Sequence, residues 1–172
     1  MPRGNIETVY PRILVLSGIR KSVRELEYRA AFVACQNHQV DLNILYDYDT
    51  ELWTSNAERF IDQLKKPSRV DEFVQKLKEE DVTNTLYRDS SIAEAITDGH
   101  IPAANMIKPS KINRICDALI EVLKRKPAAY QQNIITAHVC KRPPDLIAAL
   151  TMVSDLRGTS QEEADKIGRA HV

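Results

Sequence analysis

The sequence has no excess of either charge, no long apolar run and few aromatic residues. Lysine plus arginine total 24, as do aspartate plus glutamate, which argues against a protein dominated by nucleic-acid binding, because such proteins usually carry a strong basic excess. No run of about 18 apolar residues occurs, so we expect no membrane-spanning helix. Met1–Asn5 contain no apolar core, which predicts that no signal peptide is present.

Cysteine is also scarce. Cys35, Cys116 and Cys140 lie far apart, and no C-x-x-C pair occurs. An odd number of widely spaced cysteines is typical of reduced thiols, so the sequence predicts a cytosolic or nuclear protein. No catalytic constellation interrupts the chain either, and we therefore expect no cofactor and no enzymatic activity.

The chain is rich in short amphipathic segments separated by proline, serine or glycine. At 43% hydrophobic residues, its 172 residues can bury a real core. Apolar residues recur at helical spacing after Ser110, a good N-cap. Short links between such segments predict antiparallel neighbours. We therefore predict an all-α fold, an α-solenoid of stacked antiparallel helical hairpins similar to tetratricopeptide repeats, although no fixed sequence period is visible.

The spacing of apolar and turn residues predicts where these helices begin and end. We expect a hairpin or bent helix over residues 11–36 and a helix capped by Thr50 and stopped by Pro67. Ser68 begins the next helix, and Gly158 ends the last one. The expected parts are helical hairpins over 1–87, a flexible loop over 88–109, three further helices over 110–158 and a frayed tail over 159–172.

The last six residues, Ile167–Val172, match one reading frame of a common sequencing adapter. We interpret them as non-native, the alternative being a genuine polar terminus.

An acidic run echoes a calcium-binding loop. Asp47, Asp49 and Glu51 alternate, and Glu58 follows eleven residues after Asp47. The sixth position of such a loop needs glycine for its sharp turn, but this chain has Leu52 there. An acidic helix N-terminus is therefore favoured over a calcium site.

A zinc site and an activated thiolate are the other chemical alternatives. His138 and Cys140 could join Cys35 or Cys116 at a zinc ion, or His138 could activate a thiol. Structural zinc sites normally use closely spaced ligand pairs. Because His138 and Cys140 stand two residues apart on a predicted helix, they face different directions, and packed helix residues are the favoured interpretation.

Positive charge is concentrated in the second half of the chain. The centre of this basic region, Lys124, Arg125 and Lys126, could contact RNA phosphates. Only Tyr130 could stack on a base there, so a solvated helix face is favoured over RNA binding. The region comprises Lys108, Lys111, Arg114, Lys124, Arg125, Lys126, Lys141 and Arg142.

A charged segment ends one predicted helix and leads into a loop. It has no neighbouring nucleophile or histidine, and an exposed carboxylate has no reason to act as a base. We expect it to make helix-terminal or inter-helix contacts and, as a candidate, to contact a partner protein. Its residues are Lys78, Glu79, Glu80, Asp81 and Thr83.

Several uncommon words in the sequence resemble a known family. They are M-P-R-G-N-I-E at 1–7, V-D-L-N-I-L-Y-D at 40–47, L-K-E-E-D-V-T-N-T-L-Y at 77–87 and I-T-A-H-V-C-K-R-P-P-D-L at 135–146. In this order and spacing they resemble the middle region of the largest subunit of the Elongator complex, at the start of its helical solenoid.

The resemblance implies a scaffold without catalytic residues here. The family protein carries two N-terminal β-propellers, a long solenoid and a C-terminal dimerisation region that this chain would lack. It organises the other Elongator subunits, one of which carries the radical-SAM and acetyltransferase chemistry. The complex installs the carboxymethyl-type modification on the wobble uridine of certain tRNAs. We therefore expect the other subunits as partners, with tRNA engaged indirectly.

Overall fold

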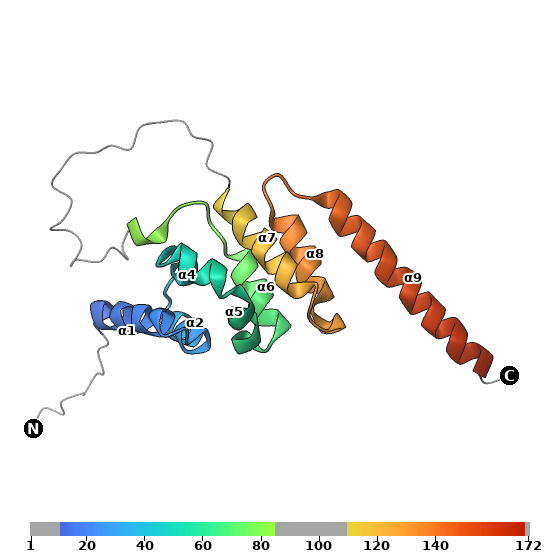
Figure 1. Ribbon diagram of the computed structural model, residues 1–172, viewed down its shortest axis with the longest axis horizontal. Coiled ribbons are helices and arrows are strands. Elements are labelled where there is room, and N and C mark those ends of the chain that lie inside the picture. Colours follow the sequence, from blue (N-terminus) through green and yellow to red (C-terminus); the bar gives the residue numbers. More distant parts are fainter. Residues whose placement is uncertain (1–10, 85–109, 171–172) are drawn as a thin grey trace, which may run out of the picture. The chain divides into compact units, whose positions relative to one another are not determined.

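A computed structural model describes the backbone of residues 11–84 and 110–170 and the side chains as far as Gly158. Helices account for all regular structure in these described ranges, which confirms the all-α prediction. The chain divides into two compact units. Figure 1 labels most of their helices. Within the described residues, unit 1 comprises 11–63 and 80–84, and unit 2 comprises 64–79 and 110–170. The expected loop over 88–109 and residues 1–10 lie outside the described residues.

Unit 1 begins with the predicted helical hairpin. Helices α1 (Arg12–Arg24) and α2 (Tyr28–Asn37) pack on each other through faces such as that of Ile19. The connection turns at Leu26, which adopts a positive φ of 58°. The Gln63 side chain fixes this turn, because its amide donates to the Leu26 carbonyl (2.8 Å) and accepts from the Arg29 N–H (3.1 Å).

The rest of unit 1 surrounds an aromatic cluster. The ring of Trp53 lies 5.3 Å from that of Tyr46 and 5.3 Å from that of Phe60, and Tyr28 meets Phe60 edge to face at 5.5 Å. Each of these four aromatic side chains is buried, so each contributes a large apolar area to the core of unit 1. The elements are α3 (Ile44–Asp47), α4 (Thr50–Ser55), α5 (Ala57–Leu64) and the 3-10 turn η1 (Val82–Asn84).

The prediction of one helix capped by Thr50 is wrong in two respects. Asp49 is the N-cap, since its carboxylate accepts from the Leu52 N–H at 2.9 Å. The helix is also interrupted at Asn56, whose amide donates to the Leu52 carbonyl at 2.8 Å. Asparagine competes with the backbone in this way, and it divides α4 from α5.

Unit 2 is built around α8 (Gln131–Cys140), which contacts α6 (Pro67–Gln75), α7 (Lys111–Leu123) and α9 (Leu146–Ala170). The turn η2 (Ala128–Tyr130) precedes α8. Because α6 packs on α8, residues 64–79 belong to unit 2. Ser110 caps α7 as predicted, its hydroxyl accepting from the Asn113 N–H at 3.2 Å.

Two predicted helix ends in unit 2 are wrong. Pro67 belongs to the first turn of α6 and Lys66 is its N-cap, so the helix does not start at Ser68; proline is favoured at that position because its missing N–H needs no partner there. Helix α9 continues through Gly158 to Ala170, so residues 159–170 are helical rather than frayed. Glycine costs a helix only about 1 kcal/mol, and the Q-E-E-A-D-K run that follows favours helix.

Candidate functional site

Two carboxylates of the charged segment Lys78–Thr83 accept hydrogen bonds from other residues of the chain. Glu79 accepts hydrogen bonds from the Ser110 hydroxyl and the Lys111 N–H (2.9 Å), at the N-terminus of α7. Anions stabilise that end of a helix because its backbone N–H groups point outward.

Asp81 does the same for η1. It accepts from the Thr83 N–H (2.8 Å), the Thr83 hydroxyl (2.5 Å) and the Asn84 amide (2.9 Å). The side chains of Lys78 and Glu80 are exposed. A partner contact by this segment stays a prediction, and these two exposed residues are its best candidates.

The basic residues of the second half do not form one stripe. Lys111 is buried, only 7% exposed, and Lys141 pairs with Asp117. Lys124 pairs with Glu121 at 3.0 Å at the end of α7. Lys108 lies outside the described residues. Arg114 lies in α7, Arg125 and Lys126 follow its end, and Arg142 follows the end of α8.

The end of α7 also positions the next cation of the predicted RNA-contacting group. The Arg125 guanidinium donates to the Glu121 carbonyl at 3.3 Å. Arg125 is exposed and Lys126 half-buried. An RNA contact by Lys124, Arg125 and Lys126 stays a prediction.

The acidic residues considered for calcium binding accept backbone hydrogen bonds or lie in the first turns of helices. Asp47 accepts from the Val82 N–H at 2.9 Å, and Asp49 caps α4. Glu51 and Glu58 stand in the first turns of α4 and α5, where the helix dipole favours negative charge. Across 11–84 and 110–158, no group of three or more His, Cys, Asp or Glu side chains is placed to hold a metal ion.

The cysteines lie in different environments. Cys35 belongs to the core of unit 1 and Cys116 to that of unit 2, and burial raises the pKa of each thiol to about 12. Cys140 is partly exposed; burial, then the nearby Asp71, raise its pKa. His138 places Nδ1 3.2 Å from the Asp145 carboxylate. The histidine considered as an activator of a thiol thus contacts a carboxylate at the start of α9.

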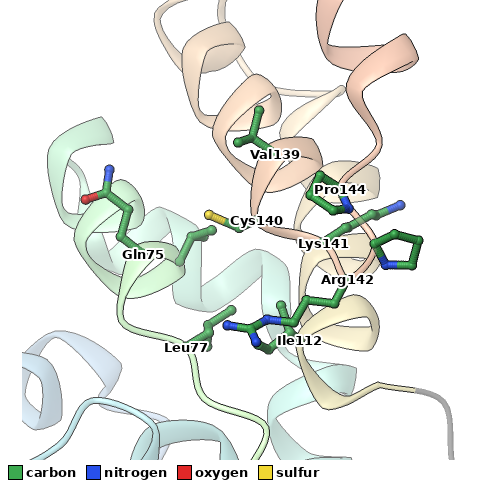
Figure 2. A pocket seen from close by; sticks show the side chains of 10 residues that line it. Gln75, Leu77, Ile112, Val139, Cys140, Lys141, Arg142 and Pro144 are labelled. Atoms are coloured by element: carbon green, nitrogen blue, oxygen red, sulfur yellow. The ribbon is translucent and has the colours of Figure 1, made fainter.

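A groove of about 450 Å³ lies within unit 2, where α6 ends, α7 begins and α8 ends (Figure 2). The buried apolar side chains of Val74, Leu77 and Ile112 line its base. Val139, which is 46% exposed, and the exposed Pro143–Pro144 pair add apolar surface to its walls. The groove can therefore cover an aliphatic side chain.

Arg142 supplies the charge of this groove. Asn113 holds its backbone from both sides, donating to the Arg142 carbonyl and accepting from the Arg142 N–H, each at 2.8 Å. The side chain runs across the groove toward Leu77, whereas that of Lys141 is directed away from it (Figure 2). No acidic and no aromatic residue lines the groove. The geometry suits binding rather than catalysis, because no nucleophile and base meet in it.

Sequence reasoning did not anticipate this groove. In the sequence, Lys141 and Arg142 belong to the basic region of the second half, and nothing in that grouping indicates a groove. The visible sign of the groove in the sequence is that Arg142 immediately precedes two prolines, whose apolar rings follow the cation in the chain.

A family model described as "ELP1 alpha-solenoid" matches residues 12–171, which is most of the chain and includes both units. The chain belongs to the Elongator complex protein 1 family. This result confirms the resemblance read from the sequence and assigns the helical units to the solenoid of that family.

Curated members of the Elongator complex protein 1 family are similar along nearly the whole chain. Identity is 37% to that of Saccharomyces cerevisiae over 94% of this chain, and 39% to that of Schizosaccharomyces pombe over 96%. Elongator complex protein 1 of Oryctolagus cuniculus is 33% identical over 97% of this chain. The chain spans only 12–13% of the length of these relatives. Among the described helices, none is long and apolar enough to cross a bilayer.

Proposed function

We propose that this chain is a non-catalytic scaffold segment of the Elongator complex. It supports modification of the tRNA wobble uridine by organising the catalytic and accessory subunits. The observation that carries the proposal is the match of the Elongator complex protein 1 solenoid to residues 12–171, together with the helical fold. Solenoids work through extended surfaces rather than enclosed active sites.

The use of charged side chains supports this role. Most carboxylates that the sequence marked as candidates for chemistry are hydrogen-bonded to helix ends or backbone N–H groups, as Asp49 and Glu79 illustrate. These carboxylates stabilise helix ends and turns. The described part of the chain is therefore suited to holding helices in position.

Exposed apolar side chains support it as well. Ile13 and Leu14 of α1 are 73% and 67% exposed, and Ile147 and Leu150 of α9 are 83% and 67% exposed. Apolar groups exposed side by side on one helix commonly mark protein contacts. Each unit thus offers a helix face for further helices or for partner subunits.

The test is affinity purification of the full-length protein carrying Lys78→Glu and Glu80→Lys. These exchanges keep the net charge and change exposed side chains. We expect reduced recovery of partner subunits and, in the same cells, reduced wobble-uridine modification measured by mass spectrometry of tRNA. The neighbouring exchange Lys76→Glu with Glu72→Lys keeps an exposed i,i+4 pair and serves as the control. Full recovery of subunits and of modified uridine would count against a partner contact by this segment.

A further inference from the structure

The groove of unit 2 has a fixed cation beside an apolar surface. Arg142 is exposed, and its backbone is held by the paired hydrogen bonds to Asn113. Because α7 fixes that backbone, the side chain starts from a defined position at the groove. A preorganised guanidinium loses less conformational entropy on pairing than one on a free loop.

Among residues 11–84 and 110–158, no carboxylate pairs with this cation. Glu79, at the start of α7, is hydrogen-bonded to Ser110 and Lys111. Asp117 pairs with Lys141. Within the described residues, the Arg142 guanidinium has no acidic partner, and no acidic side chain lines the groove. The groove therefore complements a ligand that brings its own negative charge.

The remaining lining selects among anionic ligands. Val139 and the Pro143–Pro144 pair expose apolar surface in the same groove, and the Gln75 amide adds a neutral hydrogen-bonding group. Single-stranded nucleic acid is bound by several cations together with aromatic stacking. Here Lys141 and Arg142 line the groove, but Lys141 pairs with Asp117, and no aromatic side chain is part of the lining. An aliphatic side chain followed by a carboxylate matches this lining better than a nucleotide does.

We propose that this groove is a docking site for an acidic segment of a partner protein, in which an aliphatic side chain covers Val139 and the prolines while a neighbouring Asp or Glu pairs with Arg142. Arginine and carboxylate can form two parallel hydrogen bonds, which adds direction to the contact. The inference goes beyond the proposed function, because it concerns folded unit 2 itself and can be tested without any other subunit.

Cys140 provides a readout inside the groove. It lines the groove and is partly exposed, whereas Cys35 and Cys116 are buried. The rate at which N-ethylmaleimide alkylates Cys140, followed by peptide mass spectrometry, therefore reports whether the groove is occupied. The two buried thiols serve as internal controls for unfolding.

The probe is a pool of octapeptides with two adjacent aliphatic positions followed by two acidic positions, mixed with the full chain. Two control pools replace the acidic positions by Asn and Gln, or the aliphatic positions by Ser. We expect only the first pool to slow Cys140 alkylation. Arg142→Glu should weaken the effect about tenfold, the loss of one interfacial ion pair. Arg142→Lys should weaken the protection less than Arg142→Glu does, since lysine keeps the positive charge but lacks the planar guanidinium that can donate two parallel hydrogen bonds.

Lys124→Glu is the matched control, because it reverses an exposed cation at the other end of α7. It should leave the effect unchanged. No protection by millimolar acidic pool overturns the proposal, as do equal protection by all pools and insensitivity to Arg142→Glu. A uridine oligonucleotide could instead protect Cys140 while the peptides do not. If Arg142→Glu abolished that protection, the groove would be a nucleic-acid site and the peptide-docking proposal would be wrong.

Discussion

Removal of the Glu79 carboxylate should destabilise the isolated chain. Glu79 accepts from the Ser110 hydroxyl and from the Lys111 N–H, so Glu79→Ala leaves the N-terminus of α7 without two of its contacts. A role confined to a partner surface predicts no such effect, because no partner is present. The stability of the purified chain therefore separates an internal role of this residue from an external one.

The expected size follows from the geometry. A hydrogen bond to a charged group contributes about 1.5–3 kcal/mol when shielded from water, but far less when exposed. Glu79 is exposed, so we take about 0.5 kcal/mol for each contact. The charge at a helix N-terminus adds about 0.3–1 kcal/mol. The loss should be about 1–2 kcal/mol, or about 3–6 °C in melting temperature for a chain of this size.

The assay is urea unfolding followed by far-ultraviolet circular dichroism. Glu79→Gln should lose about half as much as Glu79→Ala, because an amide oxygen can still accept one N–H. Glu80→Ala, the adjacent exposed carboxylate, should change stability by about 0.5 kcal/mol or less. In a double-mutant cycle with Ser110→Ala, the two changes should couple, since they share one hydrogen bond. Strictly additive effects in the cycle, or equal losses of stability for Glu79→Ala and Glu80→Ala, would refute the stabilisation of the α7 N-terminus by Glu79.

Three further outcomes are expected. Gly18→Ala should raise the free energy of unfolding by about 0.5–1 kcal/mol, because Gly18 is inside α1 and an added Cβ would meet no atom within 4 Å; a loss in urea unfolding contradicts it. Asp145 has a pKa below its ordinary 3.8, because its carboxylate accepts the Ala148 N–H and contacts His138. A pKa that is lowered in the folded state stabilises the folded chain above pH 3.8. This contribution to stability is lost as the pH falls through the pKa of the folded state. Asp145→Asn should therefore be less stable than the parent at neutral pH, and the gap should close in acid; a constant gap contradicts it. Replacement of Lys124, Arg125 and Lys126 by alanine should leave affinity for tRNA unchanged in filter binding at two salt concentrations, whereas a clear loss that is largest at low salt would support the RNA-binding alternative.

Helix interiors could be predicted from this sequence better than helix ends. The cap at Ser110 and the apolar stripe behind it are local features, and both are confirmed. Glycine is the usual residue just after a helix end, because it adopts the left-handed conformation without strain, and Gly158 therefore predicts the end of the last helix. The described chain instead turns at Leu26, Gln39 and Lys65, with φ between 52° and 59°. Tertiary packing outweighs the cost of about 1 kcal/mol at such residues, and sequence alone does not show it.

The groove could not be predicted for a related reason. It combines the end of α6, the start of α7 and the end of α8, which are separated by dozens of residues in the chain. Helical periodicity reports which face of one helix is buried. It does not report which helix ends meet. The Asn113–Arg142 pairing, a contact between residues 29 apart, holds the Arg142 backbone at the groove.

The distribution of carboxylates decides how charge variants of this chain should be interpreted. Asp49, Glu79, Asp81 and Asp145 each accept a backbone N–H at the start of a helix or 3-10 turn. A charge reversal at any of them changes helix stability as well as surface charge. Loss of assembly in such a variant therefore does not identify a contact. Arg142 differs, because its backbone holds the loop while its guanidinium has no partner among the described residues. Reversal of its charge should thus alter binding while leaving the unfolding transition of the chain in place.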